Sequence, residues 1–211
     1  MKSMIKDTLI LLLITVIAGG ILGLVYQVTK EPIRISNEEK TQEAFKAAFP
    51  GAEYFEEDGD FSVAEAEKVI KENYPNTVIE TSMYAFDADM NVLGYVIKVI
   101  SKEGYSSNIT FLVGIKLDGT INAVSLLEIN ESAGLGMNAE SVLIPQFTRK
   151  KATIFEVTKT GAKKDNEVDA ISGATITSDA ITNGVNAAVS YFDMRYGAQV
   201  VDAEGGSEDG Q

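Results

Sequence analysis

The sequence predicts an α+β fold: an antiparallel sheet packed on helices and preceded by a single N-terminal transmembrane helix. A long uncharged apolar segment lies near the start of the 211-residue chain. Four runs rich in β-branched and aromatic residues follow in the middle, separated by short turns, and indicate strands. An amphipathic segment near the C-terminus can then supply a helix that covers the sheet.

The apolar segment covers residues 8–29. A helix of this length, at ~1.5 Å per residue, spans ~33 Å and crosses a hydrocarbon core. A cleavable signal peptide is the alternative, because Ala18, Gly19 and Gly20 offer a small-residue cleavage site. Since the apolar run continues well past these glycines, we expect a retained single-pass helix that contacts the lipid bilayer of the cell (inner) membrane.

The charges around this helix predict its orientation. Lys2 and Lys6 lie in the short positive segment of residues 1–7, which favours a cytoplasmic N-terminus. The main domain is therefore expected on the extracytoplasmic side. The whole chain carries a formal net charge of −13, which repels phosphate backbones, so we expect no nucleic acid partner.

Residues 30–76 are expected to form a helical segment. Pro32 should end the membrane helix, and residues 37–49 then have the spacing of an acidic amphipathic helix. A second helix is predicted over residues 62–73, with Ser62 as N-cap and Glu65 at the spacing of a capping box.

Residues 77–200 are expected to form the main domain. Its predicted strands cover residues 78–86, 92–101, 109–117 and 121–129, and Asp118-Gly119 indicates a hairpin between the last two. A helix over residues 138–146, a strand-like run over 152–160 and a last helix over 178–194 follow. Residues 201–211 are acidic and glycine-rich and predict a disordered tail.

The composition excludes several kinds of chemistry. The chain contains no Cys and no His. It therefore has no disulfides, no thiolate-held iron–sulfur cluster, and neither a Ser-His-Asp nor a Cys-His catalytic site. The usual ligands of zinc and haem are missing as well. A redox role would need an organic cofactor or a group held by oxygen ligands.

The segment from Asp169 to Ser178 is the most informative part of the chain. Gly173 and Ala174 give a turn with small side chains just before an amphipathic helix, where free N–H groups and the helix dipole favour a phosphate. A threonine hydroxyl at this place could be esterified. The alternative is ordinary capping, in which hydroxyl groups satisfy the first N–H groups of the helix.

The run Asp169-Ala170-Ile171-Ser172-Gly173-Ala174-Thr175 resembles the flavinylation motif D-x-x-[ST]-G-A-[ST] of FMN-binding domains. In that family a flavin transferase uses FAD to place FMN on the last hydroxyl of the motif, through a phosphoester. The resemblance implies that Thr175 is the acceptor. It also implies that Asp169, Ser172, Gly173 and Ala174 belong to the cofactor site.

Two further segments resemble parts of the same family. Glu131-Ser132-Ala133-Gly134-Leu135-Gly136 is similar to the E-T-P-G-L-G loop that lies against the flavin, with Ala133 in place of proline. It implies cofactor contacts by Glu131, Ser132, Leu135 and Gly136; a glycine-rich connection is the alternative. Residues 104–108 match the family's G-Y-G-G-P turn only at Gly104 and Tyr105.

The layout of the chain, apart from the tail, resembles the G subunit of the Rnf electron-transport complex and the homologous C subunit of the sodium-pumping NADH:quinone reductase. This implies an electron-transfer subunit with covalent FMN, rather than an enzyme on its own. Its expected partners are other membrane subunits, in a complex that links ferredoxin, NAD and ion movement, and a flavin transferase. The alternatives are a stand-alone extracytoplasmic flavin reductase and an anchored non-redox binding module.

Overall fold

The computed structural model describes residues 2–151 and 153–205. They divide into two compact units, one up to Gln42 and one from Glu43 onward. The first unit is the N-terminal part of helix α1 (Lys2–Ala48), whose apolar side chains are exposed. Within the described ranges, α1 is the one helix that is long and apolar enough to cross a membrane. Residues 206–211 of the expected tail lie outside these ranges.

Helix α1 does not end at Pro32, so the predicted stop there is wrong. Proline removes one N–H donor, but the following turns remain helical. Arg34 forms ion pairs with Glu31 at 2.6 Å and Glu38 at 2.5 Å, one turn away on each side. Pairs at this spacing support a helix. The helix expected over residues 37–49 is therefore the last part of α1.

The main sheet has five strands in the order β1-β2-β3-β4-β5, and all neighbours are antiparallel. This confirms the predicted fold class. The strands are β1 (Tyr54–Glu57), β2 (Thr77–Phe86), β3 (Val92–Ser101), β4 (Ile109–Lys116) and β5 (Ile121–Glu128). Strand β1 was not expected, because it lies in the segment that the sequence assigned to helices. At the β4–β5 hairpin Gly119 has a φ of +75°, a conformation that glycine adopts without strain.

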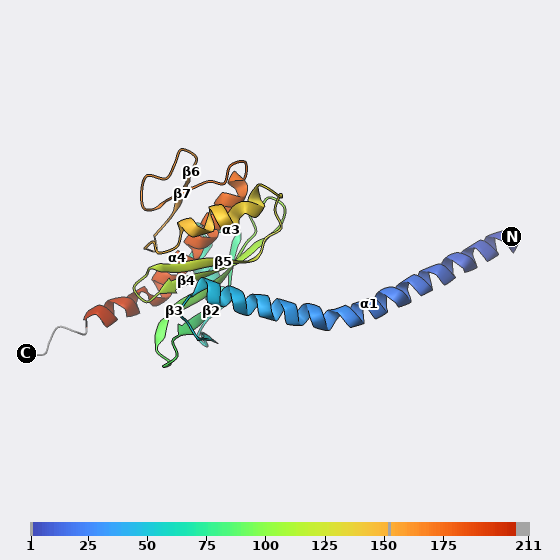
Figure 1. Cartoon of the computed structure of the whole chain (residues 1–211), viewed down its shortest axis with the longest axis horizontal. Coiled ribbons are helices and arrows are strands. Elements are labelled where there is room, and N and C mark those ends of the chain that lie inside the picture. The colour runs from blue at the N-terminus through green and yellow to red at the C-terminus, as the bar shows by residue number, and fades with distance from the viewer. Residues whose placement is uncertain (1, 152, 206–211) are drawn as a thin grey trace, which may run out of the picture. The chain divides into compact units, whose positions relative to one another are not determined.

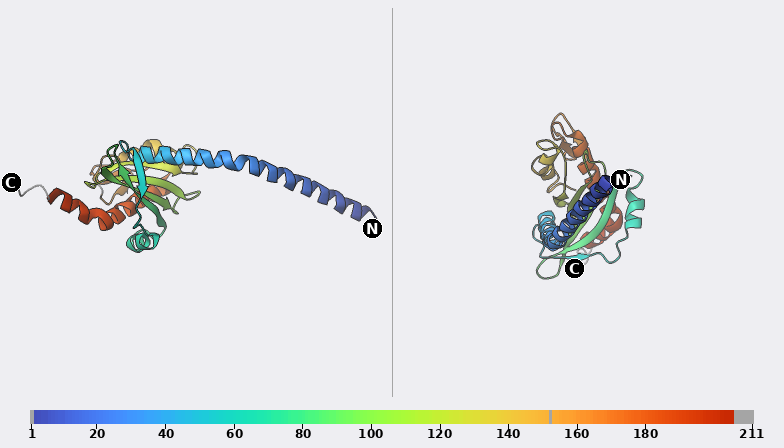
Figure 2. Two further views of the ribbon diagram at one scale, coloured as in Figure 1. Left: turned by 90° about the horizontal axis from the view of Figure 1, so that it is seen from below. Right: turned by 90° about the vertical axis from the view of Figure 1, so that its right-hand side faces the viewer.

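Helices cover both faces of this sheet (Figures 1 and 2). Alternate residues of β3, such as Tyr95 and Ile97, belong to the larger core under α2 (Val63–Ile70) and α4 (Thr175–Gly205). Val96 points to the opposite face, where it packs with Phe45 and Phe49 near the end of α1. This alternation follows from the two-residue period of a strand. The sheet therefore lies between two apolar cores.

Two glycines let the end of α1 approach the sheet closely. A Cβ at Gly94 would lie 2.8 Å from Phe49 Cε2, and one at Gly114 would lie 3.2 Å from Phe49 Cδ2 and collide with the Ala48 carbonyl. Side chains at Gly94 and Gly114 would therefore force the helix away. The glycines form a shallow seat for Ala48 and Phe49.

Short elements connect β5 to the last helix. They are η1 (Gly136–Asn138), α3 (Ala139–Val142), η2 (Ile144–Gln146) and a parallel pair of β6 (Glu156–Thr158) and β7 (Glu167–Asp169). The helix expected over residues 138–146 is thus interrupted, and the strand expected over 152–160 is reduced to β6. Helix α4 starts at Thr175 and continues through residues 201–205, which the sequence had assigned to the tail.

Candidate functional site at the start of α4

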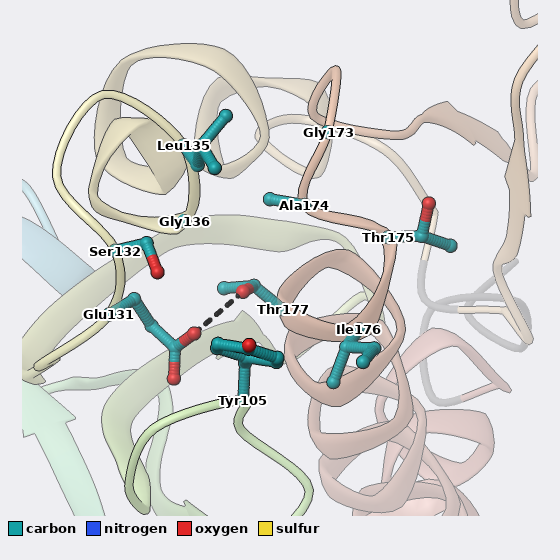
Figure 3. Close-up of a pocket in the computed structure, with 10 residues that line it drawn as sticks. All are labelled: Tyr105, Glu131, Ser132, Leu135, Gly136, Gly173, Ala174, Thr175, Ile176 and Thr177. Atoms are coloured by element: carbon teal, nitrogen blue, oxygen red, sulfur yellow. Dashed lines mark hydrogen bonds between the residues drawn. The ribbon is translucent and has the colours of Figure 1, made fainter.

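A cavity of about 420 Å³ lies where three segments meet: the turn after β3, the loop after β5 and the first turn of α4 (Figure 3). This volume is in the range of sites that bind small molecules. Its lining residues are Tyr105, Glu131, Ser132, Leu135, Gly136, Gly173, Ala174, Thr175, Ile176 and Thr177. The structure therefore brings together the three segments that the sequence singled out.

The turn before α4 is held by its own backbone and by one buried serine. Gly173 has a φ of +75°, and a Cβ there would lie 3.0 Å from Leu135 Cδ2. Ser178 Oγ accepts a hydrogen bond from Ile171 N at 2.9 Å and donates one to Ala174 O at 2.9 Å. The Ser178 side chain thus closes the turn from inside the helix. Sequence reasoning placed Ser178 at the helix start but did not predict these hydrogen bonds of its hydroxyl.

The two threonines of the first helical turn have different environments. Thr177 is 1% exposed, and its Oγ1 donates a hydrogen bond of 2.9 Å to Glu131 Oε2. Thr175 is partly exposed, and no hydrogen bond of its hydroxyl occurs within the described part of the chain. In Figure 3 the Thr177 side chain points to Glu131, whereas that of Thr175 lies beyond Ala174, away from Glu131. Of the two threonine hydroxyls, only that of Thr175 is therefore available at the edge of the cavity.

Glu131 is a buried carboxylate at one end of the cavity, 7% exposed. Besides the bond from Thr177, its Oε1 accepts one from Ser106 N at 3.1 Å. Glycines pack on both sides of it. A Cβ at Gly104 would lie 2.9 Å from Glu131 Oε1, and one at Gly136 would lie 2.7 Å from both Glu131 Cβ and Thr177 Oγ1. Side chains at either glycine would break up this cluster.

The rim of the cavity is apolar and exposed. Tyr105 is 67% exposed, Ile176 52% and Leu135 41%. Gly134, with a φ of +73°, shapes the loop that presents Leu135, and its carbonyl accepts a bond from Asn138 Nδ2 at 2.9 Å. Large exposed apolar side chains gathered around a cavity are typical of a ligand site.

The site also suits a phosphate. The N–H groups of Thr175, Ile176 and Thr177 start α4, and the first backbone bond across this turn is Ser178 N to Ala174 O at 3.0 Å. The first N–H groups of a helix have no acceptor within it and attract anions. Apolar rim, side-chain-poor turn and free N–H groups together fit the ring and phosphate of FMN.

Three of the predicted site residues do not line the cavity. Asp169 Oδ1 accepts a hydrogen bond from Ala162 N at 2.8 Å and so ties down the β6–β7 loop. Ser172 is exposed on the turn. Gly104 lies against Glu131 rather than at the surface of the cavity. Conversely, Ile176 and Thr177 line it, although the sequence had not assigned them to the site.

Two known protein families match separate parts of the chain. Residues 104–190 match the FMN-binding domain, and residues 1–47 match the RnfG N-terminal region. These two matches cover the cavity with the turn before α4 and, separately, most of helix α1. Residues 104–190 are therefore an FMN-binding domain.

Individual relatives agree with these matches. The chain is 33% identical to the G subunit of the Na⁺-translocating ferredoxin:NAD⁺ oxidoreductase complex of Acetobacterium woodii, over 90% of this chain and 92% of that one. It is 27% identical to the G subunit of an ion-translocating oxidoreductase complex of Methanosarcina acetivorans, over 93% and 98% of the two chains. A crystal structure of NqrC from Shewanella oneidensis is 21% identical, covers 58% of this chain and 61% of that one, and gives a TM-score of 0.46. From the family matches and the first of these relatives, the chain belongs to the G subunits of Rnf-type ion-translocating oxidoreductase complexes.

Proposed function

We propose that Thr175 carries FMN through a phosphoester on its side-chain oxygen, and that the flavin transfers electrons within a membrane complex. The observation that supports this choice of residue is the contrast between the two threonines. Thr177 Oγ1 is buried and already bonded to Glu131, whereas Thr175 is partly exposed at the edge of the cavity. Of the two hydroxyls, only that of Thr175 can react without breaking a buried contact.

The attachment step balances as a phosphoryl transfer. The Thr175 oxygen forms a bond to the flavin-side phosphorus of FAD, the bond from that phosphorus to the AMP oxygen breaks, and the hydroxyl proton is released. Oxidation states do not change. The phosphate then lies beside the free N–H groups of the first α4 turn, which stabilise it by about 0.3–1 kcal/mol near a surface. The covalent bond, rather than this attraction, retains the cofactor.

The chain's own residues then orient the bound group. Leu135, Ile176 and Tyr105 give apolar surface to a planar ring, and Glu131 contributes a buried carboxylate nearby. FMN supplies one- or two-electron transfer when bound, which needs no acid–base residue from the protein. This agrees with a chain that has no His and no Cys.

The partners of the relatives suggest those of this chain. Relatives named as subunits of ferredoxin:NAD⁺ oxidoreductase and ion-translocating complexes support an electron-transfer role beside other membrane subunits. A flavin transferase is the proposed maturation partner, and residues 8–29 are the proposed contact with lipid. In this proposal the FMN-binding domain lies on the extracytoplasmic side, which the positive charges of Lys2 and Lys6 support.

The test compares intact mass and in-gel flavin fluorescence of three full-length chains, made with a competent flavin transferase and exported. Wild type should carry one FMN, Thr175→Val should carry none, and Thr177→Ser should carry one. Thr175→Val removes the hydroxyl while nearly keeping the volume, and Thr177→Ser keeps a donor for Glu131.

The other outcomes separate the alternatives. Wild type without added flavin mass would leave an anchored non-redox binding module whose turn is a helix cap. FMN retained on Thr175→Val would mean that another hydroxyl is the acceptor, and Thr177, two residues further on, would be the first candidate. A flavin-loaded chain that purifies without any membrane partner and reduces acceptors alone would support a stand-alone reductase.

A further inference from the structure

One edge of β7 is paired with side chains instead of a strand. On the other edge β7 pairs with β6 in parallel. Gln146 Oε1 accepts a hydrogen bond from Asp169 N at 2.7 Å, and Gln146 Nε2 donates one to Asp169 O at 3.1 Å. Lys150 Nζ donates to Glu167 O at 3.0 Å on the same edge. Strand β7, which leads into the turn of residues 170–174 before Thr175 (the acceptor turn), is thus fixed on both sides.

Gln146 links two segments that each lead to one wall of the cavity. It ends η2, the last of the short helices that follow the loop of Glu131 and Gly136. Its Nε2 also donates to Val142 O at 2.9 Å, which anchors the side chain on its own segment. Asp169, its partner, is the first residue of the run that ends at Thr175. The glutamine therefore sets where the acceptor turn begins, relative to the opposite wall.

The end of the same turn is fixed by Ser178. Its hydroxyl bonds Ile171 N and Ala174 O, as described above. Between the two fixed ends the chain runs through Ser172 and Gly173, which are exposed. Glycine adds conformational freedom that must be restricted from outside the turn. If the Gln146 pairing were lost, Ser178 would still hold one end while the start of the turn could move.

We propose that Gln146 is a positioning residue for flavin attachment: by pairing with the Asp169 backbone it holds Thr175 in the orientation that the transferase requires. This rests on the proposed function of Thr175. Gln146 has no place at the acceptor oxygen or the incoming phosphate in this proposal. Its loss therefore lowers the rate at which the bound transferase attaches FMN, and not the final amount of FMN per chain. A fixed orientation speeds a reaction because the reacting groups start close to the productive geometry.

The chain contains a matched control for the structural effect. Asn186, 3% exposed on α4, uses its side-chain amide in the same way: Oδ1 accepts from Phe155 N at 2.8 Å and Nδ2 donates to Phe155 O at 2.9 Å. Asn186→Leu removes a two-bond amide–backbone pairing that does not involve the acceptor turn. It measures what loss of such a pairing does through stability alone.

The experiment follows attachment in vitro with the full-length chain in detergent, FAD and purified flavin transferase, with the concentration of the chain varied. Gln146→Met should lower kcat by about tenfold or more and leave KM within about twofold. It should still reach one FMN per chain on long incubation. Asn186→Leu should have a kcat close to that of wild type, although its unfolding midpoint falls. Gln146→Asn keeps the amide on a side chain one methylene shorter, and should also be slow.

The results separate this inference from the proposed function. If folded Gln146→Met has the kcat of wild type, the proposed role of Gln146 is wrong, while Thr175 remains the acceptor. If Gln146→Met does not fold, a wild-type kcat in Gln146→Asn leads to the same conclusion. The same holds if Asn186→Leu slows attachment as much as Gln146→Met does. If the wild-type chain accepts no FMN at Thr175, the proposed function fails, and the role of Gln146 fails with it.

Discussion

Thr177 Oγ1 and Glu131 Oε2 are joined by a hydrogen bond of 2.9 Å although 46 positions separate them in the sequence. Both residues are buried. The bond ties the first turn of α4 to the loop after β5, and Glu131 continues it to the turn after β3 through Ser106 N. One carboxylate therefore links the three chain segments that form the candidate cavity.

Thr177→Val should destabilise the domain by about 1–3 kcal/mol, because it leaves one oxygen of a buried carboxylate without its donor. Thr177→Ser, which keeps the hydroxyl, should lose less than half as much. Urea unfolding of the full chain in detergent measures both. Equal stability of the valine variant and wild type would mean that this hydrogen bond contributes nothing to the fold.

Gly136→Leu should lower flavin loading and shift the flavin absorbance. A Cβ at this position already lies 2.7 Å from Glu131 Cβ and Thr177 Oγ1, so the side chain must push the two apart. Gly197→Ala on α4 is the control, since a Cβ there meets nothing within 4 Å. Loading and spectrum that remain unchanged in Gly136→Leu would mean that the loop is only a connector.

Glu131→Gln should raise the reduction potential of the bound flavin. A negative charge close to the ring disfavours the addition of electrons, and the amide keeps the size and an acceptor oxygen without the charge. A redox titration of flavin-loaded protein measures the shift. Glu65→Gln, which neutralises an exposed carboxylate on α2, should change the potential less. A potential of Glu131→Gln at or below that of wild type argues against the electrostatic role.

The stability of the domain should fall in alkali between pH 10 and 12. Burial raises the pKa of Tyr95 to about 12, and burial, followed by the hydrogen bond to Asp58, raises the pKa of Tyr196 as well. The unfolded chain loses these protons near pH 10 while the folded chain keeps them. The stabilisation is therefore complete below pH 10 and is lost as the pH rises, by about 1.4 kcal/mol per pH unit for each group.

Tyr196→Phe tests this pH dependence. Tyr196 OH donates to Asp58 Oδ2 at 2.6 Å, so the variant should be less stable than wild type at pH 8. Its free energy of unfolding should nevertheless fall less steeply above pH 10, because one raised pKa is absent. Parallel slopes in urea titrations from pH 8 to 12 would show that Tyr196 does not contribute.

A reporter fused after residue 211 should be active only if it works outside the cytoplasm. The expectation comes from Lys2 and Lys6 on the N-terminal side of the apolar helix. Paired fusions to an exported phosphatase and to a cytoplasmic fluorescent protein measure the sidedness. Phosphatase activity supports the proposed topology, whereas cytoplasmic fluorescence reverses it.

The sequence predicts the long strands well because their signals are local. Strand β3 has the bounds that its apolar run indicated, and the β4–β5 hairpin follows from Asp118-Gly119. Strands β1 and β7 were missed because they have four and three residues and several charges. What makes them strands is pairing with another segment, β2 for β1 and β6 for β7, which no pattern within the short strand itself encodes.

The same distinction holds for the candidate site. The motif ending at Thr175 and the loop from Glu131 to Gly136 could be identified from the sequence by resemblance. The parts that hold them in place could not. Gln146 and Ser178 act through side-chain bonds to backbone groups seven to 23 positions away, a kind of contact without periodicity in the sequence. Pro32 caused the opposite kind of error. It is a strong local signal for a helix end, but helix α1 continues past it.

The seat of Ala48 and Phe49 on Gly94 and Gly114 limits where the protein can be shortened. A water-soluble fragment that starts at residue 50 would lose Phe45 and Phe49 and would uncover Val96 and Leu112 on the outer sheet face. Such a bare apolar surface favours aggregation. A fragment that begins at Glu43, where the second compact unit starts, carries its own cover. The last turns of α1, well past the predicted membrane span, are therefore a part of the folded domain.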